Sequence, residues 1–234
     1  MIKKFAMIIL CLSLAVTVFI MIAGVGQDTA TGIRDESGTD GQDASKIEQD
    51  YAQQKRQSGK TAAWLNVPNI CYYPVMYSGD NSFYLEHNHL DEPDVAGAVF
   101  INKGCKPDFN SKILLIHGHN MADGRMFANL DRYMGEDFFR ENPAIQVFDG
   151  GKLRFYQPFT VFLLEDGKEY IELDQKSGED HAAYLESLKQ RSLCRTDDNF
   201  IMDTDKNAIF LSTCNYAFED ARLIIGAVEF EIEK

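Results

Sequence analysis

A cysteine at the end of an apolar run is the residue best suited to carry chemistry. The run Ile209–Thr213 leads into Cys214, and a second strand-like run, Ala221–Ile225, follows after a short loop. If the two runs pair antiparallel across that loop, Cys214 and Arg222 become neighbours. A guanidinium beside the sulfur could stabilise the oxyanion of a tetrahedral intermediate, which is worth about a few kcal/mol. The pair predicts nucleophilic catalysis by Cys214, assisted by Arg222.

A cysteine nucleophile normally needs a histidine, because the thiolate is the reactive form and its proton must be exchanged. Of the five histidines, His117 and His119 end the apolar run Ile113–Ile116, where one strand end can meet another. Alternation along a strand places both on one face, so either could serve Cys214. A zinc site built from these three residues is an alternative, but no further ligand is indicated. We therefore expect neither a metal nor another cofactor.

The elements that must position these residues are mainly strands. Runs rich in β-branched and aromatic residues occur at 70–77, 98–102, 112–117, 145–149, 153–164, 208–214 and 222–231. Two segments, 125–133 and 179–191, have helical patterns. Many short strands with a few helices favour a closed barrel or a sandwich. We expect this mainly β catalytic domain to cover residues 61–234.

The first 60 residues differ from this domain in composition. A basic tip, residues 1–4, precedes an almost purely apolar run at 5–25, which is long enough as a helix to cross a bilayer. The positive-inside rule leaves the tip in the cytoplasm and exports the rest. We expect an uncleaved transmembrane anchor in the cell membrane, followed by a polar stalk at 26–60 that is helical in part, over Ala44–Gln57.

The overall charge and the cysteines limit the remaining possibilities. A net charge of -13 argues against a nucleic-acid partner, which would require a basic face. Cys71, Cys105, Cys194 and Cys214 would lie outside the cytoplasm, where disulfides can form. Their scattered spacing shows no disulfide framework, so we expect mostly free thiols.

Several segments, in order along the chain, resemble class B sortases. The run His117–Phe127 resembles their active-site stretch, in which a histidine precedes Asn-Met and an Asp-Gly-x-Met-Phe segment. Leu211–Cys214 resembles the family signature, and Asp220–Arg222 its following arginine. Weaker similarities extend the resemblance over residues 64–230. It implies a sortase-type β-barrel with Cys214 as nucleophile, His119 as proton-transfer partner and Arg222 as oxyanion or substrate-positioning group. His117 departs from the pattern, since tyrosine is more usual there.

The resemblance also implies a substrate groove. The residues that match its positions are Asn81, Leu85, Tyr170, Ile171, Ser212 and Thr213. An alternative for Asn81 is a capping role in the polar turn at residues 79–82.

The reaction implied by the resemblance is a transpeptidation. Such an enzyme cleaves a C-terminal sorting motif of secreted proteins after threonine, holds the acyl group as a thioester on Cys214 and transfers it to an amine. The acceptor would be a cell-wall peptide or lipid-linked precursor outside a Gram-positive type of membrane. Two alternatives stay open, namely a cell-wall thiol hydrolase without transfer and an anchored, non-catalytic binding protein. The order of histidine before a strand-end cysteine disfavours papain-like wall peptidases.

Overall fold

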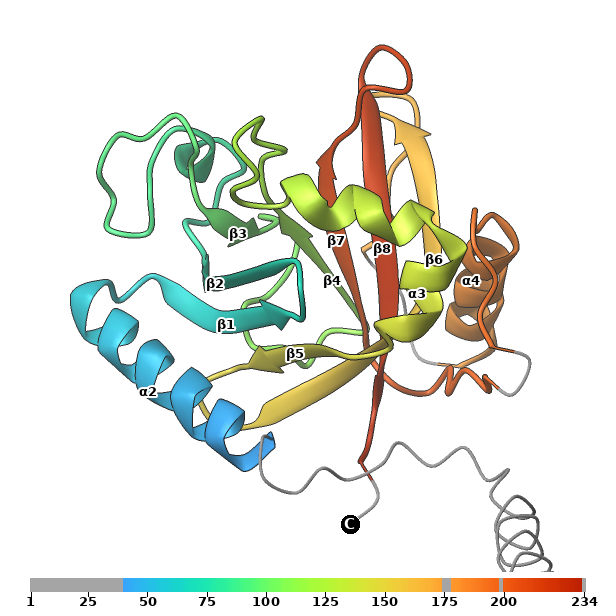
Figure 1. Cartoon of the computed structure of the whole chain (residues 1–234), viewed down its shortest axis with the longest axis horizontal. Coiled ribbons are helices and arrows are strands. Elements are labelled where there is room, and N and C mark those ends of the chain that lie inside the picture. Colours follow the sequence, from blue (N-terminus) through green and yellow to red (C-terminus); the bar gives the residue numbers. More distant parts are fainter. Residues whose placement is uncertain (1–39, 174–177, 198–199, 233–234) are drawn as a thin grey trace, which may run out of the picture. The chain divides into compact units, whose positions relative to one another are not determined.

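The strands of the chain close into a barrel. The computed structural model describes residues 40–173, 178–197 and 200–232, and from Gly41 onward they belong to one compact unit. The strands of this part are β1 (Thr61–Val67), β2 (Cys71–Met76), β3 (Val99–Ile101), β4 (Ile113–His117), β5 (Ile145–Phe148), β6 (Leu153–Glu165), β7 (Ala208–Cys214) and β8 (Ala221–Phe230). The prediction of a mainly β closed barrel with a few helices is confirmed (Figure 1).

The strand order brings the two candidate segments to one end of the barrel. Around the barrel the order is β1-β2-β3-β4-β7-β8-β6-β5, and β5 pairs with β1 to close it. Strands β4 and β7 run parallel, with His117 opposite Ser212, whereas β7 and β8 are antiparallel. The carboxyl ends of β4 and β7 therefore lie side by side, next to the start of β8.

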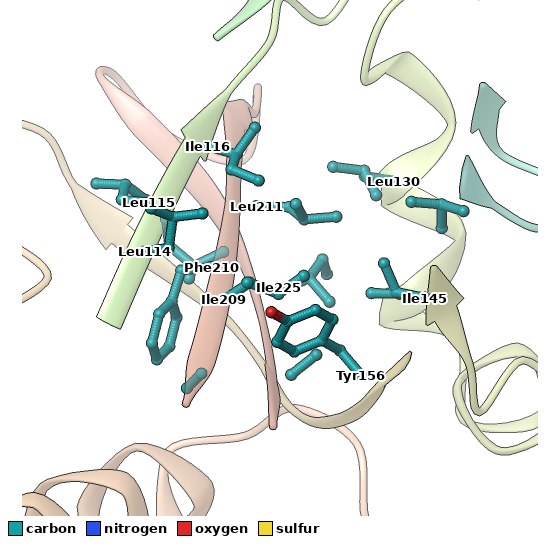
Figure 2. Close-up of a cluster of buried hydrophobic side chains, with 14 of the residues drawn as sticks. Leu114, Leu115, Ile116, Leu130, Ile145, Tyr156, Ile209, Phe210, Leu211 and Ile225 are labelled. Atoms are coloured by element: carbon teal, nitrogen blue, oxygen red, sulfur yellow. The ribbon is translucent and has the colours of Figure 1, made fainter. Parts of the chain in front are cut away.

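The barrel interior is filled with branched and aromatic side chains. Strands β4 and β7 are buried along almost their whole length, which explains why their sequences are continuous apolar runs rather than alternating ones. Figure 2 shows part of this core, where side chains of β4, β7 and β8 meet Leu130, Ile145 and Tyr156 from other elements. The buried core holds the strand ends that carry the candidate catalytic residues.

Gly226 of β8 lies where the packing between strands is tightest. A Cβ at this position would come within 2.6 Å of Thr160 Cγ2 and 2.7 Å of Phe210 Cε1, and both of those residues are fully buried. We expect Gly226→Ala to lower the free energy of unfolding by about 1–3 kcal/mol, the usual cost of overpacking. Urea unfolding at pH 7 measures it, with Gly59→Ala as control because nothing lies within 4 Å of a Cβ there. Equal stability of the Gly226 variant and the wild type would contradict this view of the core.

Helix α2 (Asp40–Gln57) contacts the barrel in the range where the sequence predicts a partly helical stalk. Ile47 is buried, and the ring of Tyr51 packs edge-on against Phe148 of β5 with centroids 5.2 Å apart. Gln54 Nε2 donates a hydrogen bond of 2.8 Å to the carbonyl of His89. The apolar stripe of this helix is thin, and a polar contact adds to it, since Tyr72 of β2 donates a hydrogen bond of 2.7 Å from its hydroxyl to Asp50 Oδ2. The helix lies along the side of the barrel that carries β1 and β5 (Figure 1).

The predicted helix at 125–133 differs from the structure. The chain instead forms a 3-10 helix, η2 (Ala128–Met134), followed by α3 (Glu136–Glu141). Gly135 between them is extended, with φ −89° and ψ 126°, so the two turns cannot merge into one α-helix. Leu130 and Tyr133 are still buried, so the apolar pattern is right although the backbone geometry is wrong.

The second predicted helix is confirmed as α4 (Glu179–Gln190). Its face with Leu185 and Leu188 is buried, and Thr160 Oγ1 of β6 donates a hydrogen bond of 2.7 Å to the carbonyl of Leu188. A further 3-10 turn, η1 (Phe83–Leu85), follows β2.

The predicted membrane span at 5–25 and the first part of the predicted stalk lie outside the described residues. Of the helices in the described ranges, none combines the length and the apolar character needed to cross a bilayer.

Candidate active site

Cys214 and Arg222 are direct neighbours at the end of the barrel. Cys214 is the last residue of β7 and lies opposite Arg222 in the antiparallel ladder, as hairpin geometry predicts. Arg222 Nη1 donates a hydrogen bond to the Sγ atom of Cys214. The Cys214 residue is partly exposed, whereas Cys71, Cys105 and Cys194 are buried free thiols. The expectation of free thiols is confirmed for these four cysteines.

Arg222 also binds a carboxylate that the sequence analysis misses. Its Nε and Nη2 atoms donate hydrogen bonds of 3.1 Å and 2.7 Å to Asp166 Oδ2. Burial lowers the pKa of Arg222, but the partners Asp166 and Cys214 outweigh it and raise the pKa above its ordinary value. In the sequence, Asp166-Gly167 is typical of an ordinary turn. Only the pairing of β6 with β8, with Leu164 opposite Arg222, could have pointed to Asp166.

His119 lies two residues beyond the end of β4. Its Nε2 atom is 2.9 Å from the carbonyl oxygen of Leu85. Because a carbonyl can only accept, Nε2 must carry a hydrogen, so Nδ1 is the nitrogen left to exchange a proton with another group. The preceding Gly118 is required here, since a Cβ would lie 2.8 Å from the buried ring of Phe127. The carbonyl of His119 accepts a hydrogen bond of 2.9 Å from the Phe127 N–H, which fixes the loop.

Asn120 ties the histidine loop to the cysteine strand. Its Nδ2 atom donates a hydrogen bond of 2.9 Å to the carbonyl oxygen of Cys214. The next residue, Asn215, donates through Nδ2 to Asp131 Oδ1 at 3.1 Å, and its own N–H binds the carbonyl of Ala221. These contacts hold the end of β7 in one position relative to the loop that carries His119.

His117 is neutral and bound to a side chain. Asn102 Nδ2 donates to His117 Nε2 at 2.9 Å, and Asn102 Oδ1 accepts the Gly104 N–H at 2.9 Å, which sets the orientation of the amide. Burial, together with the charge of Arg222, lowers the pKa of His117 to about 4, although Asp166 acts in the opposite direction. The ring is therefore uncharged at neutral pH.

The pH dependence of stability should report this neutral ring. Because folding lowers the pKa of His117 from 6.5 to about 4, the unfolded chain binds more protons in that window. The stability due to the neutral ring is present above pH 6.5 and is lost as the pH falls toward 4, by up to about 1.4 kcal/mol per pH unit. We expect His117→Gln to flatten this dependence, measured by urea unfolding between pH 7 and pH 4. If the free energy of unfolding depended on pH in the same way for both proteins, the neutral state of His117 would be contradicted. Burial also lowers the pKa of His181, but that residue is present in both proteins and so does not affect the comparison.

A pocket of about 440 Å³ lies beside Cys214. It is lined by every residue that the sequence analysis assigns to the site: Asn81, Leu85, His119, Tyr170, Ile171, Ser212, Thr213, Cys214 and Arg222. His117 and Asp166 line it as well. The strand order therefore brings together residues that are more than 100 positions apart in the sequence.

The side chains of the pocket wall differ in how they are held. Asn81 Oδ1 accepts the Lys103 N–H at 2.7 Å, while Asp80 Oδ1 caps the turn by accepting the Ser82 N–H. The alternative capping role for Asn81 is therefore wrong. Thr213 is almost fully buried, and its hydroxyl has no hydrogen-bond partner among the described residues. Tyr170 is 73% exposed.

Nothing in the described ranges forms a group of three or more His, Cys, Asp or Glu side chains placed to hold a metal ion. The alternative zinc site requires nitrogen atoms of both His117 and His119 to face the sulfur. The Nε2 atoms of these rings are already bound to Asn102 and to the Leu85 carbonyl, so only their Nδ1 atoms could take part in such a site.

Comparison with known proteins decides the family. Sortase B of Listeria monocytogenes is 33% identical over 155 residues, covering 65% of this chain and 62% of the relative. The solved structure of sortase B from Listeria monocytogenes is 30% identical, with a TM-score of 0.64, and the match covers 77% of this chain and 99% of that one. The chain belongs to the class B sortase family.

A second curated sortase B, from Staphylococcus aureus, is 27% identical over 166 residues, covering 66% of this chain and 64% of the relative. The match thus spans less than two thirds of the length of either curated sortase B. No family model matches the chain. The predicted resemblance of the chain to class B sortases is confirmed.

Proposed function

We propose that this class B sortase is a cysteine transpeptidase in which Cys214 is the nucleophile, His119 exchanges protons and Arg222 stabilises the oxyanion. The observation that carries the proposal is the hydrogen bond from Arg222 to the Cys214 sulfur, at the wall of a pocket that His119 also lines. A thiol, an imidazole and a guanidinium with these relations form the minimum set for acyl transfer through a thioester.

In the first half-reaction the proton of the Cys214 thiol passes to His119. The sulfur then attacks the backbone carbonyl carbon of the threonine in the sorting motif. The negative charge then develops on the carbonyl oxygen, where Arg222 Nη1 can donate a hydrogen bond. When the intermediate collapses, His119 returns the proton to the leaving amine. The acyl group remains on Cys214 as a thioester.

In the second half-reaction an amine attacks the thioester. His119 takes a proton from the attacking amine, the new amide forms, and the sulfur leaves as a thiolate that regains the proton. The free Nδ1 of His119 suits both transfers, because Nε2 is held by Leu85 and cannot turn to the sulfur without losing that hydrogen bond.

The substrate-binding proposal rests on the two sides of the pocket. Asn81 and Leu85 line it together with Ser212 and Thr213, and Tyr170 and Ile171 come from the segment after β6. The Thr213 hydroxyl is buried without a hydrogen-bond partner among the described residues, which is costly. We propose that it binds a peptide carbonyl when the pocket wall shifts on peptide binding and exposes it.

The variant Thr213→Val separates binding from folding. We expect kcat/KM for a sorting peptide to fall about 5- to 10-fold, which corresponds to one hydrogen bond. The midpoint of thermal unfolding should stay equal or rise, because valine removes a buried, unpaired hydroxyl. The matched control is Thr160→Val, which should lower that midpoint since the Thr160 hydroxyl binds the Leu188 carbonyl. A loss of stability with unchanged kcat/KM for Thr213→Val would argue against its role with substrate.

The cellular setting follows from the N-terminal sequence. We propose a single-pass protein anchored by residues 5–25, with a cytoplasmic N-terminus and the barrel outside a Gram-positive type of membrane. Its partners would be secreted proteins that carry a sorting signal, and a cell-wall peptide or lipid-linked precursor would supply the amine.

A transfer assay tests the proposal against the thiol hydrolase. The purified full chain is incubated with a peptide that carries a Thr-containing sorting motif, with and without triglycine, and the products are identified by mass. A triglycine adduct is expected, and its formation should compete with hydrolysis. Cleavage that yields only the free acid at every triglycine concentration would favour the hydrolase.

A further inference from the structure

Arg222 divides its guanidinium between two partners. One edge, formed by Nε and Nη2, donates to a single oxygen of Asp166, and the remaining Nη1 donates to the sulfur of Cys214. A planar guanidinium held along one edge has little freedom left to rotate. The direction of Nη1 toward Cys214 therefore depends on where the carboxylate lies.

The backbone fixes the position of Asp166. The Asp166 N–H donates a hydrogen bond of 2.9 Å to the carbonyl of Asp220, just beyond the point where Glu165 pairs with Ala221. Asp166 thus continues the β6–β8 ladder at the end where Arg222 begins. The pairing of β6 with β8 therefore determines the backbone positions of both Asp166 and Arg222.

The ion pair between Arg222 and Asp166 is too exposed to add much to the free energy of unfolding. The side chain of Arg222 is 35% exposed and that of Asp166 is 48% exposed. Pairs with this exposure contribute little to folding because water screens them. The contact of the same guanidinium with the candidate nucleophile gives the pair a different use.

We propose that Asp166 is a positioning residue that holds Arg222 with Nη1 toward the sulfur and the oxyanion, and that its charge moderates the attraction between Arg222 and the Cys214 thiolate. The inference deepens the proposed function and rests on it. Without the carboxylate, the guanidinium would be free to rotate away. Its whole positive charge would also act on the thiolate, which favours ionisation of the sulfur but makes it a weaker nucleophile.

The kinetic test uses full-chain variants at position 166 with a sorting peptide. We expect Asp166→Ala to lower kcat/KM about 10-fold, less than the loss of an oxyanion donor itself, and Asp166→Glu to recover most of that loss. On an Arg222→Lys background, the same Asp166→Ala change should cost less than about 2-fold, because the group it positions is gone. A full 10-fold loss on that background, or none in the wild type, would overturn the proposal.

A second readout needs no turnover. The rate at which iodoacetamide alkylates Cys214, followed by intact mass across pH, gives the midpoint of thiol ionisation. Asp166→Asn can still accept the arginine hydrogen bonds but lacks the charge, so the midpoint should fall below that of the wild type. An unchanged or higher midpoint would refute the moderating role. The titratable groups that line the pocket with Cys214 are His117, His119, Asp166, Glu169, Tyr170 and Arg222.

The matched control is Glu231→Gln. Glu231 pairs with Lys206 at 2.7 Å beyond the far end of β8, with side-chain exposures of 73% and 36%. This variant should change neither the alkylation midpoint nor kcat/KM. If the wild type shows no peptide turnover at all, the proposed function fails, while the alkylation midpoint still decides whether Asp166 acts on Cys214 through Arg222.

Discussion

Replacing Cys214 with alanine is expected to lower peptide cleavage and transfer by about 10⁴-fold or more, the scale of losing a nucleophile in enzymes of this kind. The sulfur is the atom that forms the covalent bond, and no neighbouring group in the described part of the pocket is a second thiol. Intact-mass measurement should show an acyl adduct on the wild type in the absence of an amine, and none on the variant.

The control for Cys214→Ala is a second thiol that lies away from the pocket. Cys194 is buried, and its sulfur is 3.2 Å from the Met134 carbonyl. The Cys194→Ala variant should still form the acyl adduct on Cys214 and keep most of its activity. Its free energy of unfolding should fall, because a buried side chain is removed. Retained cleavage by Cys214→Ala, or the absence of an acyl adduct on the wild type, would mean that Cys214 is not the nucleophile.

Loss of the His119 ring should have the second-largest effect. We expect His119→Ala to lower kcat about 10²- to 10⁴-fold, because one group must take the thiol proton and return it to an amine. The buried strand β4 and the contact of Gly118 with Phe127 should keep the loop in place after the ring is removed. Added imidazole should restore part of the activity, which a folding defect would not allow.

The comparison with His117 distinguishes the two histidines. His117→Gln should lower kcat less than about 10-fold, since Gln can keep the Asn102 hydrogen bond and the wild-type ring is already neutral. If His117→Gln lowered kcat more than His119→Ala does, proton exchange would be assigned to His117 instead.

Local patterns in the sequence were sufficient to predict the strands and one strong pairing. The run before Cys214 is apolar throughout and the loop after it is short, so the Cys214–Arg222 register follows from hairpin geometry alone. The parallel pairing of β4 with β7 is different, because about 90 residues separate the strands and no periodicity encodes their contact. From the residues alone, the sequence indicated only that His117 or His119 could meet Cys214 at a strand end, and the family resemblance was needed to choose His119.

The features that sequence reasoning missed depend on tertiary contacts. Asp166 looks like a turn residue until the β6–β8 ladder places it beside Arg222. The apolar spacing around Leu130 is compatible with an α-helix, and only the packing of the segment reveals a 3-10 helix that stops at Gly135. Side-chain contact, rather than local preference, decides both.

The closure of the barrel limits how a peptide can bind to it. Near Cys214, strand β7 is paired with β4 and β8, and β8 is also paired with β6, so the two strands that carry Cys214 and Arg222 have a neighbour on each side. Strand β6 pairs with β5 only as far as Tyr156, so beyond that residue its described part is paired with β8 alone. Many peptide-binding proteins gain affinity by β-augmentation, in which the ligand adds a strand to an exposed sheet edge. Strands β7 and β8 offer no such edge in the described structure, so recognition of a peptide beside Cys214 and Arg222 must come from side chains of the wall. Selectivity can then change through single substitutions in that wall, and strands that are paired on both sides leave no edge for edge-to-edge aggregation.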